Sequence, residues 1–421
     1  MNFERFNLFS EIKAGVKSLG FTTATPVQEQ SIPIILEGRD LMGLAQTGTG
    51  KTAAFVLPIL QRLMQGPRRH IRALIIAPTR ELTEQTREAI EQLGRKTGVH
   101  SMSIYGGVSI QPQINALRRG VDIVAACPGR LLDHICRRTI DLSQIEVLVL
   151  DEADRLFDMG FLPDIRKIVK RLPVNRQTLM FSATMPDAVS YLADEILHDP
   201  AKVQIDHNLP AATVSHTFYS VETHLKNDLL KQLLEKTTTG PVLVFTRTKL
   251  RSDRIAQQLA RFGFKAAALH GNLSQNKRQQ ALNGFRSGKY KILVATDVAA
   301  RGIDVPGVSH VINYDIPETA DAYTHRIGRT GRACETGDAL TFVTVQDFGP
   351  ARSIRAVLGD KLKNYTMDGC DPASAVCGGQ LPGRLIKPRT IKNTGDFSKR
   401  RINHRTKFYT SRKPRRQLSI H

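Results

Sequence analysis

Short runs of aliphatic and β-branched residues alternate with amphipathic stretches between residues 20 and 205. These runs predict strands at residues 39–44, 73–77, 102–105, 122–125, 147–150 and 178–181. Strands that alternate with helical stretches are typical of a mostly parallel sheet with helices on both faces. The first half of the chain is therefore expected to form one α/β domain.

A second series with the same rhythm comes next, with strands expected at residues 242–245, 266–269, 291–294, 310–313 and 339–343. Between the two series the periodicity is weak and Pro210 is central, which favours a short hinge. After about residue 364 the pattern stops, and the remaining residues are mainly basic and polar. The expected organisation is two α/β domains at residues 1–205 and 219–360, a linker at 206–218, and a disordered basic tail at 361–421.

The length and composition agree with this division. At 421 residues and 41% hydrophobic content, the chain fits two folded domains and an appendage. It contains no apolar run of eighteen residues and no signal peptide at its start, so we expect a cytoplasmic protein without a membrane span. The five cysteines form no CxxC pair, and the spacing of Cys370, Cys377 and His404 does not match known zinc ligands.

The chain has a formal net charge of +21, which indicates a polyanionic partner, most often nucleic acid. Residues 361–421 contain fifteen Lys and Arg against three Asp, so +12 of the excess lies in the tail. A loose, salt-sensitive contact with RNA is one interpretation of this tail. A solubilising segment is the other.

Three carboxylates come directly after the apolar run at residues 147–150: Asp151, Glu152 and Asp154. Carboxylates at the end of a buried strand are suited to binding a cation. In P-loop nucleotidases that cation is Mg²⁺ on a nucleotide phosphate, held by an Asp that ends a core strand. The cluster therefore predicts a phosphate-binding loop upstream.

Such a loop is found at residues 45–52, between an expected strand and an expected helix. Gly48 and Gly50 would let backbone N–H groups point at phosphate oxygens, at the positive end of the helix after the loop. Lys51 would reach the β and γ phosphates, and Thr52 would offer its hydroxyl to Mg²⁺. Ala45 departs from the GxxxxGK[ST] pattern. Each element alone could be an ordinary turn or a solvated helix start, but the two in this order favour a nucleotide site.

The second half lacks a phosphate loop and contains instead three arginines within residues 325–332. Arg329 and Arg332 are three residues apart, so on a helical turn both side chains could project to one side. They could stabilise charge on a phosphate in the transition state of phosphoryl transfer. A basic surface helix is the alternative.

With these residues assembled, the chain resembles a DEAD-box RNA helicase of superfamily 2, and within that family it is similar to the bacterial RhlE-like group. The resemblance covers residues 1 to 360. It rests on these segments: Phe3, Gly20-Phe21 and Thr25 to Gln28; residues 45–52; residues 77–82; Gly106-Gly107; Pro128-Gly129-Arg130; residues 151–154; Ser182-Ala183-Thr184; residues 245–248; Gln275 and Arg278; residues 295–304; and residues 325–332. The resemblance implies two tandem RecA-like domains.

The resemblance also implies an ATPase site. Gln28 would pair with the adenine of ATP, Phe21 would stack on the base, Asp151 would face Mg²⁺, Glu152 would activate or orient water, and Asp304 would contact the ribose. The remaining nucleotide contacts implied are Gln46, Thr47, Gly48, Thr49, Gly50, Lys51, Thr52 and Gly302. Lys51, Asp151, Glu152, Arg329 and Arg332 would be the catalytic residues. Asp154, Ser182, Thr184 and His325 would couple hydrolysis to RNA.

RNA binding is implied for a third set of residues, whose glycines, hydroxyls and arginines suit contacts with phosphate and sugar. They are Pro78, Thr79, Arg80, Gly107, Arg130, Arg247, Thr248, Gln275, Arg278 and Thr296. Such binding would tolerate different sequences and would distinguish RNA from DNA by the 2′-OH and the backbone shape.

The implied mechanism is that ATP and single-stranded RNA both favour a closed arrangement of the two domains, which releases one strand of a short duplex. Two alternatives stay open at this point: an ATP-gated RNA clamp without physiological unwinding, and a DNA translocase of the same superfamily. We expect a monomer. Ribosome precursors, the RNA-decay machinery and cold adaptation all remain open as partners or settings.

Overall fold

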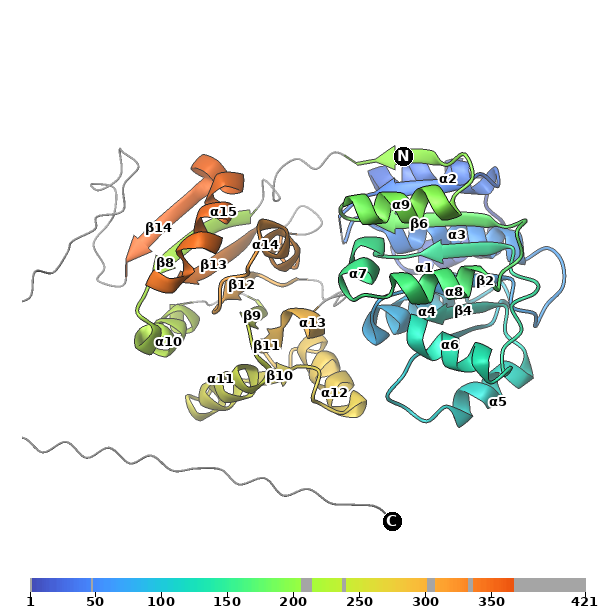
Figure 1. Cartoon of the computed structure of the whole chain (residues 1–421). Helices are drawn as coiled ribbons and strands as arrows, with labels where there is room; N and C mark the ends of the chain where they lie inside the picture. Colours follow the sequence, from blue (N-terminus) through green and yellow to red (C-terminus); the bar gives the residue numbers. More distant parts are fainter. Residues whose placement is uncertain are drawn as a thin grey trace, which may run out of the picture. The chain divides into compact units, whose positions relative to one another are not determined.

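The structure is a computed structural model that describes residues 2–46, 48–205, 214–236, 240–300, 307–331 and 336–366. These residues form two sheets of seven strands, and every strand pair in both sheets is parallel (Figure 1). The order of the first sheet is β3-β4-β2-β5-β6-β1-β7, and that of the second is β10-β11-β9-β12-β13-β8-β14. Counted from the first strand of each sheet, the two orders are identical. The predicted fold class of tandem α/β domains is confirmed.

The first sheet is built from strands β1 (Leu41–Leu44), β2 (Ala73–Ile76), β3 (Ser101–Ile104), β4 (Ile123–Ala126), β5 (Val147–Leu150), β6 (Gln177–Ser182) and β7 (Ala201–Gln204). Its helices are η1 (Phe3–Arg5), α1 (Ser10–Ser18), α2 (Pro26–Leu36), α3 (Lys51–Leu63), α4 (Arg80–Leu93), α5 (Gln111–Arg119), α6 (Pro128–Cys136), α7 (Ala153–Asp158), α8 (Leu162–Val169) and α9 (Asp187–Ile196).

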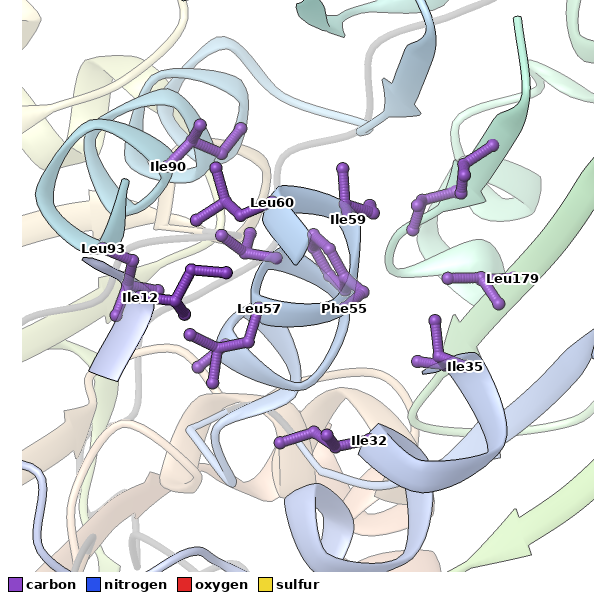
Figure 2. Packing of buried hydrophobic residues seen from close by; sticks show 14 of the residues in the cluster. Ile12, Ile32, Ile35, Phe55, Leu57, Ile59, Leu60, Ile90, Leu93 and Leu179 are labelled. Atoms are coloured by element: carbon purple, nitrogen blue, oxygen red, sulfur yellow. The ribbon is translucent and has the colours of Figure 1, made fainter. Parts of the chain in front are cut away.

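Alternate residues of these strands face two separate hydrophobic clusters. Val147 and Val149 pack with α1 to α4 on one face, while Leu148 and Leu150 pack with α6 to α9 on the other. Figure 2 shows the first cluster around α3, where Phe55 and Leu57 lie fully buried beside residues of α1, α2, α4 and β6. Since both faces are covered, the strands are almost continuously apolar. Contacts in this core therefore position α3, whose first residue is Lys51.

The second sheet is built from strands β8 (Val214–Ser220), β9 (Val242–Thr246), β10 (Ala266–Leu269), β11 (Ile292–Thr296), β12 (His310–Asn313), β13 (Gly337–Val343) and β14 (Leu362–Thr366). Its helices are η2 (Thr223–Leu225), α10 (Lys226–Lys236), α11 (Lys249–Arg261), α12 (Gln275–Arg286), α13 (Asp297–Ala300), α14 (Ala320–Ile327), η3 (Val345–Asp347), α15 (Phe348–Leu358) and η4 (Gly359–Lys361). Three clusters of buried residues fill the space between this sheet and its helices.

The second domain extends further at both ends than the sequence pattern indicated. Strand β8 begins inside residues 206–218, which were expected to be a linker, and pairs with β13 along its whole length. Strand β14 lies inside the expected tail and pairs with β8 from Leu362 to Thr366. Both strands are defined by partners far away in the sequence, so no local pattern marks them. The second sheet therefore spans residues 214–366.

Candidate active site

Most of the predicted site residues that the structure describes lie at or after the carboxyl ends of the strands, where the chain leaves each parallel sheet. In open α/β sheets this edge is where ligands bind. In the first sheet the predicted RNA contacts come after β3, β4 and β2, whereas most predicted nucleotide and coupling residues follow or end β5, β6 and β1. Phe21 and Gln28 are the exceptions, because they precede β1. The second sheet repeats the division, because its predicted RNA contacts follow or end β10, β11 and β9. The edge of the first sheet thus has a predicted RNA half and a predicted nucleotide half, which meet at the adjacent strands β2 and β5. The edge of the second sheet has a predicted RNA half and a half that bears the arginine segment, which meet at β9 and β12. The predicted nucleotide contacts Gly302 and Asp304 follow β11 in the sequence and lie outside the described residues.

The predicted phosphate loop joins β1 to α3 and ends at Gly50, whose φ of 93° lies in the left-handed region. Gly48 also has a positive φ, of 85°. Lys51 is the first residue of α3, is only 6% exposed, and donates from Nζ to the carbonyl oxygen of Ala45 at 3.0 Å. The first residue of the loop therefore accepts a hydrogen bond from the lysine that follows the loop. Thr49 donates to the carbonyl oxygen of Gln46 at 2.7 Å, which tightens the turn further.

Gln28 ties helix α2 to this loop. Its Nε2 donates to the carbonyl oxygen of Gly50 at 3.0 Å, and its Oε1 accepts from the backbone N–H of Thr25 at 3.0 Å. A Cβ at position 50 would lie 2.4 Å from Gln28 Nε2 and would displace that amide, and the φ of 93° also favours glycine there. An amide has a second N–H and a second lone pair, so Gln28 keeps one donor and one acceptor for a base. Phe21, which is 44% exposed, presents an open ring.

Asp151 comes directly after β5 and is buried, with 2% exposure. Burial raises the pKa of Asp151 to about 6, although the charge of Lys51 works in the opposite direction. Within the described residues its Oδ1 has no hydrogen-bond partner. A buried carboxylate oxygen without a partner costs free energy unless a cation or donor reaches it. The site thus fits Mg²⁺, with the half-buried Thr52 on α3 as a second oxygen ligand.

Glu152 has a left-handed backbone, with φ 51° and ψ 55°, at the N-terminal cap of α7. This conformation is costly for a residue with a Cβ, and such outliers cluster at functional sites. Glu152 Oε2 accepts from Arg155 Nη1 at 2.7 Å, and both side chains are buried. Arg155 therefore fixes the carboxylate next to Asp151.

Asp154 is the centre of a hydrogen-bond network that links α7 to the end of β6. Its Oδ2 accepts from both the backbone N–H and the hydroxyl of Thr184, at 3.0 and 3.1 Å. Ser182 Oγ accepts from the Asp154 N–H at 3.1 Å and donates to the Thr184 carbonyl oxygen at 2.6 Å. His325 Nε2 of the second sheet lies 3.9 Å from Asp154 Oδ2.

The charges around this network set its protonation. Burial would raise the pKa of Asp154, but Lys51, His325 and Arg155 outweigh it and hold that pKa below its ordinary value. Burial, with Arg155 nearby, lowers the pKa of His325. Asp154 is thus ionised and His325 neutral at pH 7, so their contact is not a full ion pair.

The predicted projection of Arg329 and Arg332 to one side of a helical turn stays a prediction, because Arg332 lies outside the described residues. Helix α14 ends at Ile327, and Arg329 lies in the next turn, where it is buried with 4% exposure. Thr330 turns the chain away by donating its hydroxyl to the carbonyl oxygens of Val308 and Ser309. Four predicted residues lie outside the described residues: Thr47, Gly302, Asp304 and Arg332.

The RNA candidates of the first sheet form a connected group. Thr79 caps α4 by accepting from the Leu82 N–H at 3.3 Å, and Pro78 precedes it. Arg80 passes so close to Gly107 that a Cβ there would lie 2.1 Å from Arg80 Nη1. Arg130 is held by the carbonyl oxygen of Val108 at 3.0 Å. The loops after β2, β3 and β4 are thus fitted to one another.

In the second sheet Thr248 caps α11 by accepting from the Arg251 N–H at 3.3 Å, as Thr79 caps α4 in the first. Gln275 opens α12, and Thr296 ends β11 with 7% exposure. Gln275 accepts from Arg80 at 3.3 Å. Arg278 pairs with Glu81, with Nη2 2.7 Å from Oε1.

Sequence reasoning missed several residues that hold the predicted ones in position. Glu81 and Arg155 lie within or beside the recognised motifs, and their charge next to a motif was the available signal. Arg326 was noted only as a member of the arginine segment, yet its guanidinium pairs with Asp297 at 2.5 and 2.7 Å. Asp315 had no signal at all in the sequence.

Among the described helices, none is long and apolar enough to cross a membrane. The family model described as the DEAD/DEAH box helicase matches residues 25–192, and the helicase conserved C-terminal domain matches residues 225–334. The two matched ranges fall on the first and second sheets respectively.

The chain is also similar to curated bacterial proteins over most of its length. It is 44% identical over 399 residues to the ATP-dependent RNA helicase CshA of Listeria monocytogenes, covering 94% of this chain and 76% of that protein. It is 46% identical over 375 residues to the DEAD-box ATP-dependent RNA helicase CshA of Streptococcus pneumoniae, covering 89% and 70%. The expected similarity to the RhlE-like group stays a prediction.

Two solved structures match the fold closely. S. cerevisiae Dbp5 bound to RNA and ADP BeF3 superposes with a TM-score of 0.78 at 31% identity, covering 87% of this chain and 96% of that one. Mss116p bound to single-stranded RNA and AMP-PNP gives a TM-score of 0.77 at 30% identity, covering 86% and 78%.

Proposed function

Because this chain belongs to the DEAD-box family of ATP-dependent RNA helicases, we propose that it locally unwinds short RNA duplexes or remodels RNA–protein complexes by closing its two domains on ATP and RNA. The observation that carries the proposal is the division of each sheet edge. The proposed RNA contacts and the proposed nucleotide or arginine residues follow adjacent strands, β2 and β5 in the first sheet and β9 and β12 in the second. Ligands that bridge matching halves would favour the same closed arrangement, so each would raise the affinity for the other.

ATP would be selected by Gln28, whose remaining donor and acceptor suit adenine N7 and N6. Phe21 would stack on the base from its exposed position. Lys51 would exchange its bond to Ala45 for the β and γ phosphates, whose negative charge a buried lysine attracts strongly. The other proposed contacts are Gln46, Thr47, Gly48, Thr49, Gly50, Thr52, Gly302 and Asp304.

Asp151 and Thr52 would hold Mg²⁺, which when bound supplies positive charge to the phosphate oxygens. Glu152 is proposed to accept a proton from, or to orient, the attacking water. Its strained backbone and its bond to Arg155 aim the carboxylate. Arg329 and Arg332 would stabilise the negative charge that develops in the transition state.

The RNA backbone would bind the ten residues after or at the ends of the other strands, with contacts mainly to phosphate and sugar. Coupling is proposed to run through Asp154. Its bonds to Thr184 join it to the end of β6, and Ser182 holds both. His325 meets the same carboxylate from the second sheet. Domain closure on RNA would thereby change the positions of the residues that face the γ-phosphate.

A strand-displacement assay on a short RNA duplex tests the proposal. ATP-dependent release of one strand is expected, with little release in the absence of ATP. ATP-dependent retention without release would instead establish an RNA clamp, the second candidate function. Hydrolysis stimulated by DNA and not by RNA would point to a DNA translocase.

Glu152→Gln tests the role assigned to Glu152. The amide keeps the size of the side chain and an oxygen for Arg155, but it cannot take a proton. We expect ATP and RNA binding to persist while turnover falls by about a factor of 100 or more, so that closed complexes accumulate. Hydrolysis near the wild-type rate would contradict the assignment.

The segment after Thr366 is proposed to contribute a sequence-independent RNA contact, because its lysines and arginines would release counterions from phosphate. Deleting residues 367–421 is expected to lower RNA affinity at low salt and to flatten the dependence of affinity on salt. Unchanged affinity would leave it a solubilising segment. A cytoplasmic monomer acting on ribosome precursors or in RNA decay is the proposed setting.

A further inference from the structure

Asp315 is a buried carboxylate of the second sheet that no recognised motif contains. It lies two residues after β12, at the carboxyl edge of the sheet, and its side chain is 4% exposed. Strand β12 is adjacent to β9. Asp315 therefore stands where the RNA half of this edge meets the half that bears the arginine segment.

The side chain of Asp315 holds the loop after β9. Its Oδ2 accepts from the backbone N–H of Arg247 at 2.8 Å, and its Oδ1 accepts from Arg251 Nη1 at 2.6 Å. Its own N–H donates to the carbonyl oxygen of Phe245 at 3.2 Å. Arg247 and Thr248 are the proposed RNA contacts of this loop, so Asp315 fixes the backbone that presents them.

The carbonyl oxygen of Asp315 holds the arginine segment. It accepts from Arg326 Nη1 at 2.6 Å, and the same nitrogen also donates to Asn313 Oδ1 at 3.0 Å. The other side of the Arg326 guanidinium pairs with Asp297, which comes directly after the proposed RNA contact Thr296. A continuous series of hydrogen bonds thus connects Arg247, Asp315, Arg326 and Asp297, which belong to the loop after β9, the loop after β12, the arginine segment and the end of β11.

Lys226 balances the buried charge of Asp315. Its Nζ lies 3.6 Å from Asp315 Oδ1 and donates to the carbonyl oxygen of Tyr314 at 2.9 Å. Burial would raise the pKa of Asp315, but Arg251, the Arg247 N–H and Lys226 hold it below its ordinary value. A buried ion pair of this kind is weak evidence for stability, since apolar residues of similar volume often replace one at no cost. Stability alone therefore does not explain why the chain has a buried ion pair between Lys226 and Asp315.

We propose that Asp315 is a positioning residue that braces the RNA-binding loop 247–248 against the arginine segment 325–329, so that RNA binding aligns the segment that faces ATP. The proposal rests on the proposed RNA-dependent ATPase function. Asp315 touches neither ligand. Its accepting oxygen, rather than its charge, is the part that anchors Arg247.

Two double variants separate the acceptor from the charge. Asp315→Leu with Lys226→Met removes the ion pairs of Asp315 with Lys226 and with the half-exposed Arg251, and also the acceptor for the Arg247 N–H. Asp315→Asn with Lys226→Met also removes the ion pairs, but its amide oxygen can still accept that N–H. Both avoid leaving an unpaired buried charge, so both are expected to fold. Asp338→Asn, on β13 of the same sheet, is the exposed control.

The measurements are the melting temperature, the RNA concentration that half-saturates ATPase, and the affinity for a labelled RNA oligonucleotide with a non-hydrolysable ATP analogue. We expect the Leu/Met variant to need about tenfold more RNA both to half-saturate ATPase and to bind the labelled oligonucleotide. This is the effect expected from the loss of one anchoring hydrogen bond to a charged group. The Asn/Met variant should stay within about twofold of the wild type. Melting temperatures should be similar in the two double variants.

Wild-type RNA affinity in the Leu/Met variant would overturn the proposal, and so would equal losses in both double variants. A parallel loss of melting temperature and RNA affinity in the Leu/Met variant would also overturn it, because a purely structural role predicts that result. If the wild-type chain itself shows no RNA-stimulated ATPase, the proposed function fails, whereas the affinity comparison still decides the role of Asp315.

Discussion

The two sheets have the same strand order, yet the same place in each carries different chemistry. Helix α3 follows β1 and begins with the buried Lys51; helix α10 follows β8, through η2, and begins with the buried Lys226. The aspartates that come after the fifth strand of each sheet are Asp151 and Asp315. Each sheet thus brings a lysine and an aspartate to equivalent positions.

The connecting loops explain the difference. The loop before Lys51 contains Gly48 and Gly50, both with positive φ, whereas residues 221–225 contain no glycine. Asp151 keeps an oxygen without a partner among the described residues, while Asp315 accepts from Arg247 and Arg251. Asp151 is arranged to receive a cation and phosphate from outside the fold. The oxygens of Asp315 are already occupied by bonds within the fold. The same strand order therefore supports the proposed ATPase site in the first sheet and the proposed positioning residue Asp315 in the second.

Exchanging the two lysines for apolar residues is the strongest test of this comparison. Lys51→Ala should lower kcat/KM for ATP by at least about 100-fold, because the phosphates lose their buried positive partner. Lys226→Met should change kcat/KM by less than about threefold and instead lower the melting temperature, since it leaves Asp315 without one of its cations. Steady-state ATPase assays and thermal unfolding measure both. Equal loss of ATP turnover in the two variants would mean that Lys226 also serves phosphate.

The residues at the end of the sixth strand of each sheet give a second test. Ser182→Ala removes the acceptor of the Asp154 N–H and the donor to Thr184, and should reduce unwinding by about tenfold while RNA-stimulated ATPase falls by less than about threefold. Thr344 comes directly after β13, one residue beyond Val343, which is the counterpart of Ser182, and its hydroxyl donates to Asp347. Thr344→Val should leave unwinding within about twofold of the wild type, as strand-displacement rates would reveal.

Unwinding and hydrolysis falling together in Ser182→Ala would remove the coupling role of the Asp154 network. A comparable loss in Thr344→Val would show that the two sheets share that role, and would weaken the contrast between them.

The parts of the site that sequence predicted are those whose residues are close together in the chain. The glycines, Lys51 and Thr52 act through a single turn, and the carboxylates come after one apolar strand. The spacing of these residues along the chain is therefore enough to predict a nucleotide site. The fold class was equally accessible, because buried parallel strands are almost continuously apolar.

The parts that were missed depend on distant partners. Strand β14 has the mixed sequence Leu-Lys-Asn-Tyr-Thr at residues 362–366, and only pairing with β8, far upstream, makes it a strand. Asp315 acts on Arg247, 68 residues away. Arg329 lies in the turn after α14, and the next residue, Thr330, donates its hydroxyl to carbonyl oxygens of residues 308 and 309, about twenty residues upstream. Local spacing contains none of this information.

Truncation tests whether β14 is the counterpart of β7. A chain that ends at residue 366 should melt close to the full-length chain, whereas one that ends at residue 360 loses β14 and the stacking of Tyr365 on Tyr219, whose ring centroids are 5.6 Å apart. We expect a melting temperature lower by about 5 °C, as for a loss of roughly one to two kcal/mol in a domain of this size. Equal melting of the two truncated chains would make β14 dispensable.

The two aspartates should also respond oppositely to pH, which gives the smallest but most specific effect. Because the pKa of Asp151 is raised to about 6, the folded chain binds a proton there more tightly than the unfolded chain does. Its contribution therefore increases stability as pH falls from about 6 towards the unfolded value near 4. The lowered pKa of Asp315 works in the other direction, and its stabilisation is lost only below about pH 4.

With EDTA present, the wild-type chain and the Asp151→Asn variant should therefore diverge between about pH 7.5 and pH 5. The variant has no titrating group at position 151, so the difference between the two melting temperatures isolates that carboxylate from every other one. We expect the wild type to gain about 3 °C relative to the variant over this interval. Added Mg²⁺ should reduce this gain, because the cation and the proton compete for the same buried oxygen. A constant difference would mean that Asp151 is already paired within the fold, as Asp315 is, and the contrast between the two sites would then lie in their loops alone.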